Sequence, residues 1–226
     1  MNSPENLLMS EILSARNNIL HPEHNYYIDL ITKELTFAGE ILSRNSNTVT
    51  AFGSARTHSD SPEYARAVAC GKITAQYGYT SITGGGPGIM EAFSKGAYQN
   101  NGKVLGFSIK LPNEQASNDF IHHNITFNYF FSRKYAMMAH SNIFLYFPGG
   151  YGTLDELFEA LTMIQTKKFL NKEIILIGRD FWEPLVGFIK DKLQNQDEYI
   201  SPFDNELFRI IDEPSELETI FQYYKA

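Results

Sequence analysis

The sequence predicts an α/β protein built on a doubly wound, mostly parallel sheet with helices on both faces. From residue 48 onward, short apolar runs alternate with stretches of helical periodicity, and glycine-rich turns follow three of the runs. Strands that alternate with helices are joined by right-handed crossovers, which make the strands parallel and cover both faces of the sheet.

The elements are expected in a regular order. Strands are predicted where apolar and β-branched residues run together, in residues 48–53, 79–83, 103–109, 121–128, 142–147 and 173–178. Helices are predicted where apolar side chains recur every three or four positions, in residues 62–77, 87–100, 131–140, 153–168, 181–193 and 215–224. Gly78 is suited to the end of the first of these helices, and Pro87 to the first position of the second.

Both ends of the chain add helices to this alternating core. Residues 5–45 have an amphipathic helical pattern with a polar break at residues 21–25. We therefore expect residues 1–47 to form a helical N-terminal extension. Residues 48–226 are expected to form a single globular domain, on which the C-terminal helices of residues 181–226 pack.

Composition limits the partners and the compartment. The 226 residues are 43% hydrophobic and carry a net charge of −7, which favours one globular domain and argues against nucleic acid as a partner. The sequence has no apolar run of membrane-spanning length and no signal-type start, so no membrane partner is expected, and the expected compartment is the cytoplasm. The single cysteine, Cys70, lies in an apolar helical stretch and is expected to be a core thiol.

The most informative segment is Pro-Gly-Gly-Tyr-Gly-Thr-Leu-Asp-Glu, residues 148–156. It joins an apolar strand to a helix, and the unpaired N–H groups of a helix N-terminus bind anions such as phosphate. Glycine lets a phosphate oxygen approach the backbone closely. Asp155 and Glu156 are expected in the first helical turn beside this anion site. Thr153 and Glu156 also have the spacing of a capping box, which is the structural alternative for Glu156.

A second glycine cluster, residues 84–88, also lies between a predicted strand and a predicted helix. It is not the dinucleotide-binding fingerprint, because Ile89 stands where that motif has its third glycine, and no phosphate-binding loop of the ATPase type is present. The carboxyl ends of parallel strands lie at one edge of a sheet. We therefore expect Gly53, residues 84–88 and residues 149–152 to converge on one pocket.

Basic residues lie close to these glycine turns in the sequence. Arg56 comes after the first glycine turn, and Ser132, Arg133 and Lys134 open the helix that precedes the fifth strand. Taken alone, each cation is more simply explained as a solvated charge at the protein surface. Metal-ligand spacings are absent from the sequence, so no metal is expected. No serine-nucleophile elbow occurs either.

Together these motifs resemble the LOG family. The resemblance rests on Gly-Gly-Gly-Pro-Gly-Ile-Met at residues 84–90, on residues 148–156, on Ser-Arg-Lys at residues 132–134 and on Gly-Ser-Ala-Arg at residues 53–56, and it covers about residues 48–195. It implies a Rossmann-like fold, usually as a homodimer, with no cofactor. The implied reaction is hydrolysis of the N-glycosidic bond of nucleoside 5′-monophosphates, AMP or N6-modified AMP, to a free base and ribose 5-phosphate.

The resemblance also implies roles for particular residues. Arg133 and Glu156 correspond to the family's catalytic pair. Glu156 suits an oxocarbenium-like transition state, because a carboxylate can stabilise the positive sugar and orient water. Substrate-binding roles are expected for Ser54, Arg56, Gly85, Gly86, Gly88, Met90, Lys134, Met137, Gly149, Gly150, Gly152, Thr153 and Asp155. Phe130, Met137 and Tyr151 are further candidates to line a base pocket.

Three alternatives remain beside this interpretation. A pyridoxal-phosphate decarboxylase requires a Schiff-base lysine, and the His-Lys pair of bacterial-type decarboxylases does not occur in the chain. A molybdenum-cofactor carrier would use similar glycine turns without catalysis, but has no need of the pair of Arg133 and Glu156. A nucleotide-sensing protein is the third. Residues 166–172 depart from the plant-like, cytokinin-activating members, which leaves AMP or another purine monophosphate as a plausible substrate.

Overall fold

The computed structural model describes residues 22–45, 47–111, 117–196 and 198–225. At its centre lies a seven-stranded sheet in the order β4-β3-β2-β1-β5-β6-β7, and every neighbouring pair of strands is parallel. The strands are β1 (Thr48–Phe52), β2 (Thr80–Thr83), β3 (Val104–Ile109), β4 (His123–Phe127), β5 (Ile143–Tyr146), β6 (Glu173–Ile177) and β7 (Phe208–Ile211).

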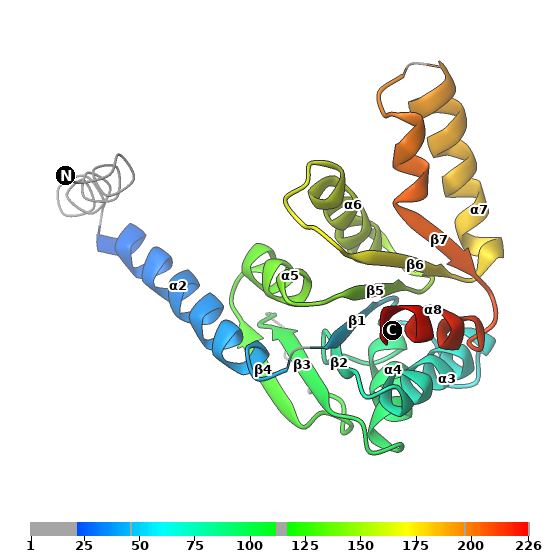
Figure 1. Ribbon diagram of the computed structural model, residues 1–226. Helices are drawn as coiled ribbons and strands as arrows, with labels where there is room; N and C mark the ends of the chain where they lie inside the picture. The colour runs from blue at the N-terminus through cyan, green and yellow to red at the C-terminus, as the bar shows by residue number, and fades with distance from the viewer. Residues whose placement is uncertain (1–21, 46, 112–116, 197, 226) are drawn as a thin grey trace.

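Helices cover both faces of the sheet, which confirms the predicted α/β class (Figure 1). The helices are α2 (Pro22–Leu42), α3 (Pro62–Gln76), α4 (Ile89–Tyr98), α5 (Phe130–Ala139), α6 (Tyr151–Gln165), α7 (Arg179–Phe188) and α8 (Glu216–Lys225). Apolar residues of α3, α4 and α8 pack on one face with Val49, Leu145 and Ile175. Those of α2, α5, α6 and α7 pack on the other with Phe52, Phe144 and Leu176.

The strands at the centre of the sheet are buried on both sides and are rich in apolar and β-branched residues. All residues of β1, β2 and β5 are buried, as parallel strands between two helical layers require. Cys70 lies in α3 with 0% exposure and is a core thiol; burial raises its pKa. Gly78 has a φ of 75° after α3 and ends that helix as predicted.

Several predicted boundaries were wrong. Helix α4 begins at Ile89, because its N-cap, Gly88, has a φ of 68°; Pro87 therefore precedes the helix. The predicted helix at 181–193 is instead α7 followed by a π-helix at Ile189–Gln196. A short 3-10 helix (Pro202–Glu206) and the strand β7 were not predicted.

The N-terminal extension is described only from residue 22. Helix α2 begins at Pro22, so the part of the predicted break that the structure describes is helical; residues 1–21 lie outside the described residues. The C-terminal half of α2 packs its Ala38 and Leu42 into the same core cluster as α5, while its other end projects from the body of the molecule (Figure 1). The division at residues 47 and 48 stays a prediction. No described helix is both long and apolar enough to cross a bilayer.

Candidate active site

The largest opening beside the predicted motifs is a cavity of about 650 Å³ at the carboxyl ends of β1, β2 and β5. Strands β1 and β5 are neighbours, yet the helix that follows β1 covers one face of the sheet and the helix that follows β5 covers the other. This is the topological switch point, where doubly wound sheets bind ligands. The lining residues include Gly53, Ser54, Ala55, Arg56, Gly84, Met90, Arg133, Met137, Gly150, Tyr151, Gly152, Thr153 and Glu156.

The backbone of Ser54 holds the three glycine turns together. Its N–H donates to the carbonyl of Pro148 at 3.1 Å, and its carbonyl accepts from the N–H of Ile89 at 3.0 Å. A Cβ on Gly88 would lie 2.4 Å from the Ser54 carbonyl oxygen, so this close approach requires glycine. The predicted convergence of the three turns is thus confirmed, and Gly88 serves the contact between turns.

Helix α6 presents its N-terminus to the cavity. Its N-cap is Gly150, which has no side chain to accept a hydrogen bond from the first turn. The first backbone N–H groups of the helix therefore remain available to an anion. The capping box of Thr153 and Glu156 does not form, because the helix begins two residues earlier, at Tyr151. Asp155 and Glu156 therefore lie in the second turn, and the prediction that placed them in the first was wrong. A Cβ on Gly150 or Gly152 would meet nothing within 4 Å.

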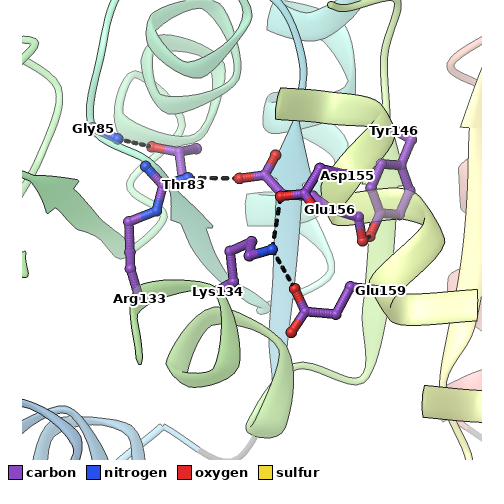
Figure 2. Close-up of polar contacts among 8 residues, drawn as sticks. All are labelled: Thr83, Gly85, Arg133, Lys134, Tyr146, Asp155, Glu156 and Glu159. Carbon is purple, nitrogen blue, oxygen red and sulfur yellow. Dashed lines mark hydrogen bonds and ion pairs between the residues drawn. The ribbon is translucent and has the colours of Figure 1, made fainter. Parts of the chain in front are cut away.

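Arg133 and Glu156 contact each other at the wall of the cavity. Arg133 Nη2 donates to Glu156 Oε1 at 2.6 Å, and each side chain is only 11% exposed (Figure 2). Burial raises the pKa of Glu156 to about 7, and the guanidinium of Arg133 opposes that rise. The carboxyl is therefore poised between its acid and base forms at neutral pH, as catalytic carboxyls often are.

One hydrogen-bond donor of the Arg133 side chain is unpaired within the part of the chain that the structure describes. This donor, the Nε–H group, is buried without a hydrogen-bond partner among the described residues. The guanidinium lies 5.8 Å from the ring centre of Phe130 and would be 3.6 Å from a Cβ on Gly84. A buried donor without a partner is costly in the free protein, and a polar ligand group can satisfy it.

A smaller cavity of about 210 Å³ adjoins the first and shares Gly84, Met90 and Arg133 with it. It is also lined by Gly85, Gly86, Ser108, Ile109, Leu111 and Phe130. The side chain of Asn118 donates to the carbonyls of Gly85 and Gly86 at 3.1 and 2.9 Å, and so fixes the glycine turn. Sequence reasoning missed Ser108, Leu111 and Asn118, which belong to no recognised motif.

Most predicted site residues line these two cavities. Four line neither: Gly88, Lys134, Gly149 and Asp155. Lys134 bonds Asp155 at 2.7 Å and Glu159 at 2.6 Å, away from the cavity (Figure 2). The Asp155 side chain is 63% exposed. A Cβ on Gly149 would lie 2.2 Å from Thr153 Oγ1, so this glycine makes room for that side chain.

The described residues contain no group of three or more His, Cys, Asp or Glu side chains that could hold a metal ion. The polar groups in the larger cavity are instead the N-terminus of α6, Arg56, Ser54, Thr153 and the pair of Arg133 and Glu156. This donor set suits an organic anion with a polar group near Glu156. Fold and site together define a doubly wound α/β protein with a polar cavity at its switch point.

The chain belongs to the LOG family. The family model described as "Possible lysine decarboxylase" matches residues 90–220. Cytokinin riboside 5′-monophosphate phosphoribohydrolase LOG5 of Arabidopsis thaliana is 31% identical over 144 residues, 63% of this chain and 62% of that protein. The probable phosphoribohydrolase LOGL5 of Oryza sativa is 30% identical over 142 residues. That alignment covers 60% of this chain and 55% of the relative, so the match spans little more than half of these relatives' length.

Solved structures of similar fold include the molybdenum cofactor carrier protein of Chlamydomonas reinhardtii. It has a TM-score of 0.60 and 20% sequence identity, over 80% of this chain and 99% of the carrier. The molybdenum cofactor binding protein of Rippkaea orientalis has a TM-score of 0.56 and 22% identity, over 79% of this chain and 96% of that protein. These similarities confirm the Rossmann-like fold.

Proposed function

We propose that this protein hydrolyses the N-glycosidic bond of nucleoside 5′-monophosphates, AMP or an N6-modified AMP, and releases the free base and ribose 5-phosphate. The observation that carries the proposal is the buried pair of Arg133 and Glu156 beside the open N-terminus of α6. The similarity to enzymes named phosphoribohydrolases supports it. A cavity of about 650 Å³ is within the size range of small-molecule sites.

The substrate phosphate binds at the N-terminus of α6 in this proposal. The backbone N–H groups of Tyr151, Gly152 and Thr153 lie in the first turn, where anions are favoured by the helix dipole. Arg56 lines the same cavity and adds a positive charge. Phosphate binding then positions the sugar carbon, so a nucleoside without phosphate should react slowly.

Glu156 and Arg133 act on the reacting bond. When the bond between the ribose C1′ and the base nitrogen breaks, its electron pair leaves with the base and positive charge develops on the sugar. Glu156 in its ionised form stabilises that charge and accepts a proton from the attacking water, whose oxygen bonds to C1′. The departing base takes up a proton from solvent and leaves neutral, and Glu156 returns its proton to solvent, so the enzyme regains its starting form. The Arg133 guanidinium stays protonated at neutral pH and holds the substrate or the departing base through hydrogen bonds, including its unpartnered Nε.

Decarboxylation with pyridoxal phosphate is not supported by the site. That chemistry requires a lysine amine in the cavity, and no described lysine lines either cavity. Lys134, which directly follows Arg133 in the sequence, forms ion pairs with two carboxylates instead.

We further propose that the protein is a homodimer that acts in the cytoplasm.

The proposal is tested by incubating the protein with AMP, GMP, CMP, IMP, N6-isopentenyl-AMP and adenosine and measuring free base by chromatography. At least one monophosphate should release its base, and the Glu156→Gln variant should no longer release it. Glu159→Gln is the matched control, because Glu159 lies one turn further along α6 and outside both cavities. Binding of a nucleotide or a pterin without base release would instead favour a carrier or a sensor.

A further inference from the structure

Helix α2 contributes a buried carboxylate that contacts the helix carrying Arg133. Glu34 is 7% exposed. Its Oε1 accepts from the backbone N–H of Asn128 at 2.6 Å and from the Asn128 side chain at 2.8 Å. Its Oε2 accepts from the Ser132 hydroxyl at 2.7 Å. A carboxylate that accepts three hydrogen bonds is an unusually firm anchor, because bonds to a charged group are about twice as strong as neutral ones.

These donors surround the N-terminus of α5. The N-cap of α5 is Tyr129, which makes no side-chain capping bond. Glu34 therefore places a negative charge beside this N-terminus, where the helix dipole favours one, and ties the residue before the N-cap to the Ser132 side chain in the first turn. Glu34 itself lies outside the glycine turns and before the segment of about residues 48–195 that carries the family resemblance, although its partner Ser132 belongs to the Ser-Arg-Lys stretch.

The opposite end of α5 is held by β1. Thr50 Oγ1 donates to the carbonyl of Met137 at 3.1 Å, and Thr48 Oγ1 donates to the carbonyl of His140 at 2.7 Å. Arg133 lies between the Glu34 contacts at one end of α5 and the β1 contacts at the other, and it directly follows Ser132, which donates a hydrogen bond to Glu34. Hence the position of the Arg133 guanidinium, 2.6 Å from Glu156, depends on α5 being fixed at both ends.

We propose that Glu34 is a positioning residue that holds α5, and through it Arg133, in register with Glu156. The expected effect on kcat rests on the hydrolysis proposed above. The effect of Glu34 on the position of Arg133 can be measured without any turnover. Small displacements of catalytic groups have large kinetic effects: about 1 Å can cost about a hundredfold in rate. Loss of the anchor should therefore lower kcat more than it changes KM.

The experiment compares Glu34→Ala and Glu34→Gln with Glu40→Ala, a control that removes an exposed carboxylate from the same helix. Steady-state kinetics with AMP give kcat and KM. In parallel, the Glu156 titration is followed by carboxyl carbon NMR, with its signal assigned by its absence in Glu156→Gln. This second measurement needs no turnover.

In Glu34→Ala we expect kcat to fall about 10- to 100-fold with a change in KM of less than about threefold. The pKa of Glu156 should rise, because the guanidinium that opposes burial is no longer held against it. Glu34→Gln should recover much of both properties, since its amide oxygen still accepts from Asn128 and the Ser132 hydroxyl can turn to the carbonyl of Tyr129, 3.1 Å away. Glu40→Ala should match the wild type.

A Glu34→Ala protein that only melts earlier, with kcat and the Glu156 titration unchanged, would overturn the proposal and leave Glu34 a purely structural residue. If Glu34→Ala does not fold, Ser132→Ala removes one of the three donors and should give a smaller shift in the same direction; no shift would again refute the role. A wild-type protein that releases no base refutes the hydrolysis, whereas the titration still decides the role of Glu34.

Discussion

Replacing Arg133 by methionine should raise the pKa of Glu156 above its value of about 7. Burial raises that pKa, and Arg133 is the main group that opposes the rise, both through its charge and through its hydrogen bond. Unit charges about 4 Å apart interact by about 4 kcal/mol at the effective dielectric constant of about 20 that suits protein sites. One pKa unit corresponds to about 1.36 kcal/mol. An interaction of that size corresponds to about three units, and water entering the vacated space reduces it, so we expect a rise of roughly one to three units.

The rise can be read from the pH dependence of kcat/KM for AMP, which reports ionisations of the free enzyme. Because the proposed reaction needs ionised Glu156, the wild-type rate should fall on the acid side of about pH 7. In Arg133→Met the rate should be lower throughout and should keep rising with pH where the wild type has reached its plateau. The ionisation of the substrate phosphate, near pH 6, is common to all variants and cancels in the comparison.

Two further variants sharpen this test. Arg133→Lys keeps a positive charge near Glu156 and should shift the acid limb less than Arg133→Met does. Arg56→Met removes a second cation that lines the same cavity, whereas the cation bonded to Glu156 is Arg133; it should raise KM and leave the acid limb where it is. An acid limb in Arg133→Met at the wild-type pH, or below it, would refute the reasoning.

Three other outcomes follow from the structure. Thr153→Ala should raise KM for AMP and barely affect the already slow reaction of adenosine, because Thr153 borders the proposed phosphate site; equal losses for both substrates in base-release assays would contradict this. Gly96→Ala should destabilise the protein by about 1–3 kcal/mol in urea unfolding, since its Cβ would lie 1.9 Å from the Val68 carbonyl oxygen, whereas Gly39→Ala, with nothing within 4 Å of its Cβ, should stabilise it by about 0.5–1 kcal/mol. The folded-state pKa of Glu156 is raised, so its contribution to stability is present below about pH 4.5 and lost by about pH 7; the unfolding free energy of the wild type minus that of Glu156→Gln should fall by roughly 2–3 kcal/mol across this range, and a constant difference would contradict the raised pKa.

The fold was largely predictable because its central strands are buried on both sides and are rich in apolar and β-branched residues. Strand β7 escaped prediction for the opposite reason. It lies at the edge of the sheet, has only four residues, and buries just one of them, Ile211. Its neighbour along the chain is a short 3-10 helix (Pro202–Glu206), so neither periodicity nor length separates this segment from a loop.

The candidate site was predictable where a local motif carries it. Glycine turns that follow parallel strands must meet at one edge of the sheet, so their convergence follows from topology alone. Glu34 and Asn118 could not be found this way, because their partners lie 94 and 33 positions away in the sequence. Nor could the start of α6, where the open glycine backbone replaces the expected cap at Thr153.

Glu156 offers a final way to separate function from structure. Its pKa remains above the ordinary range although Arg133 lies against it, so the loss of hydration on burial exceeds the attraction within the pair. A pair of this kind costs the fold stability, and exchange of both partners for neutral side chains of similar size is often neutral or stabilising. We expect the double variant Arg133→Met/Glu156→Gln to be at least as stable as the wild type at pH 8 in urea unfolding, and to release no base. A loss of about 3 kcal/mol or more, as large as that of a broken buried pair, would mean that the pair serves the fold instead of the reaction.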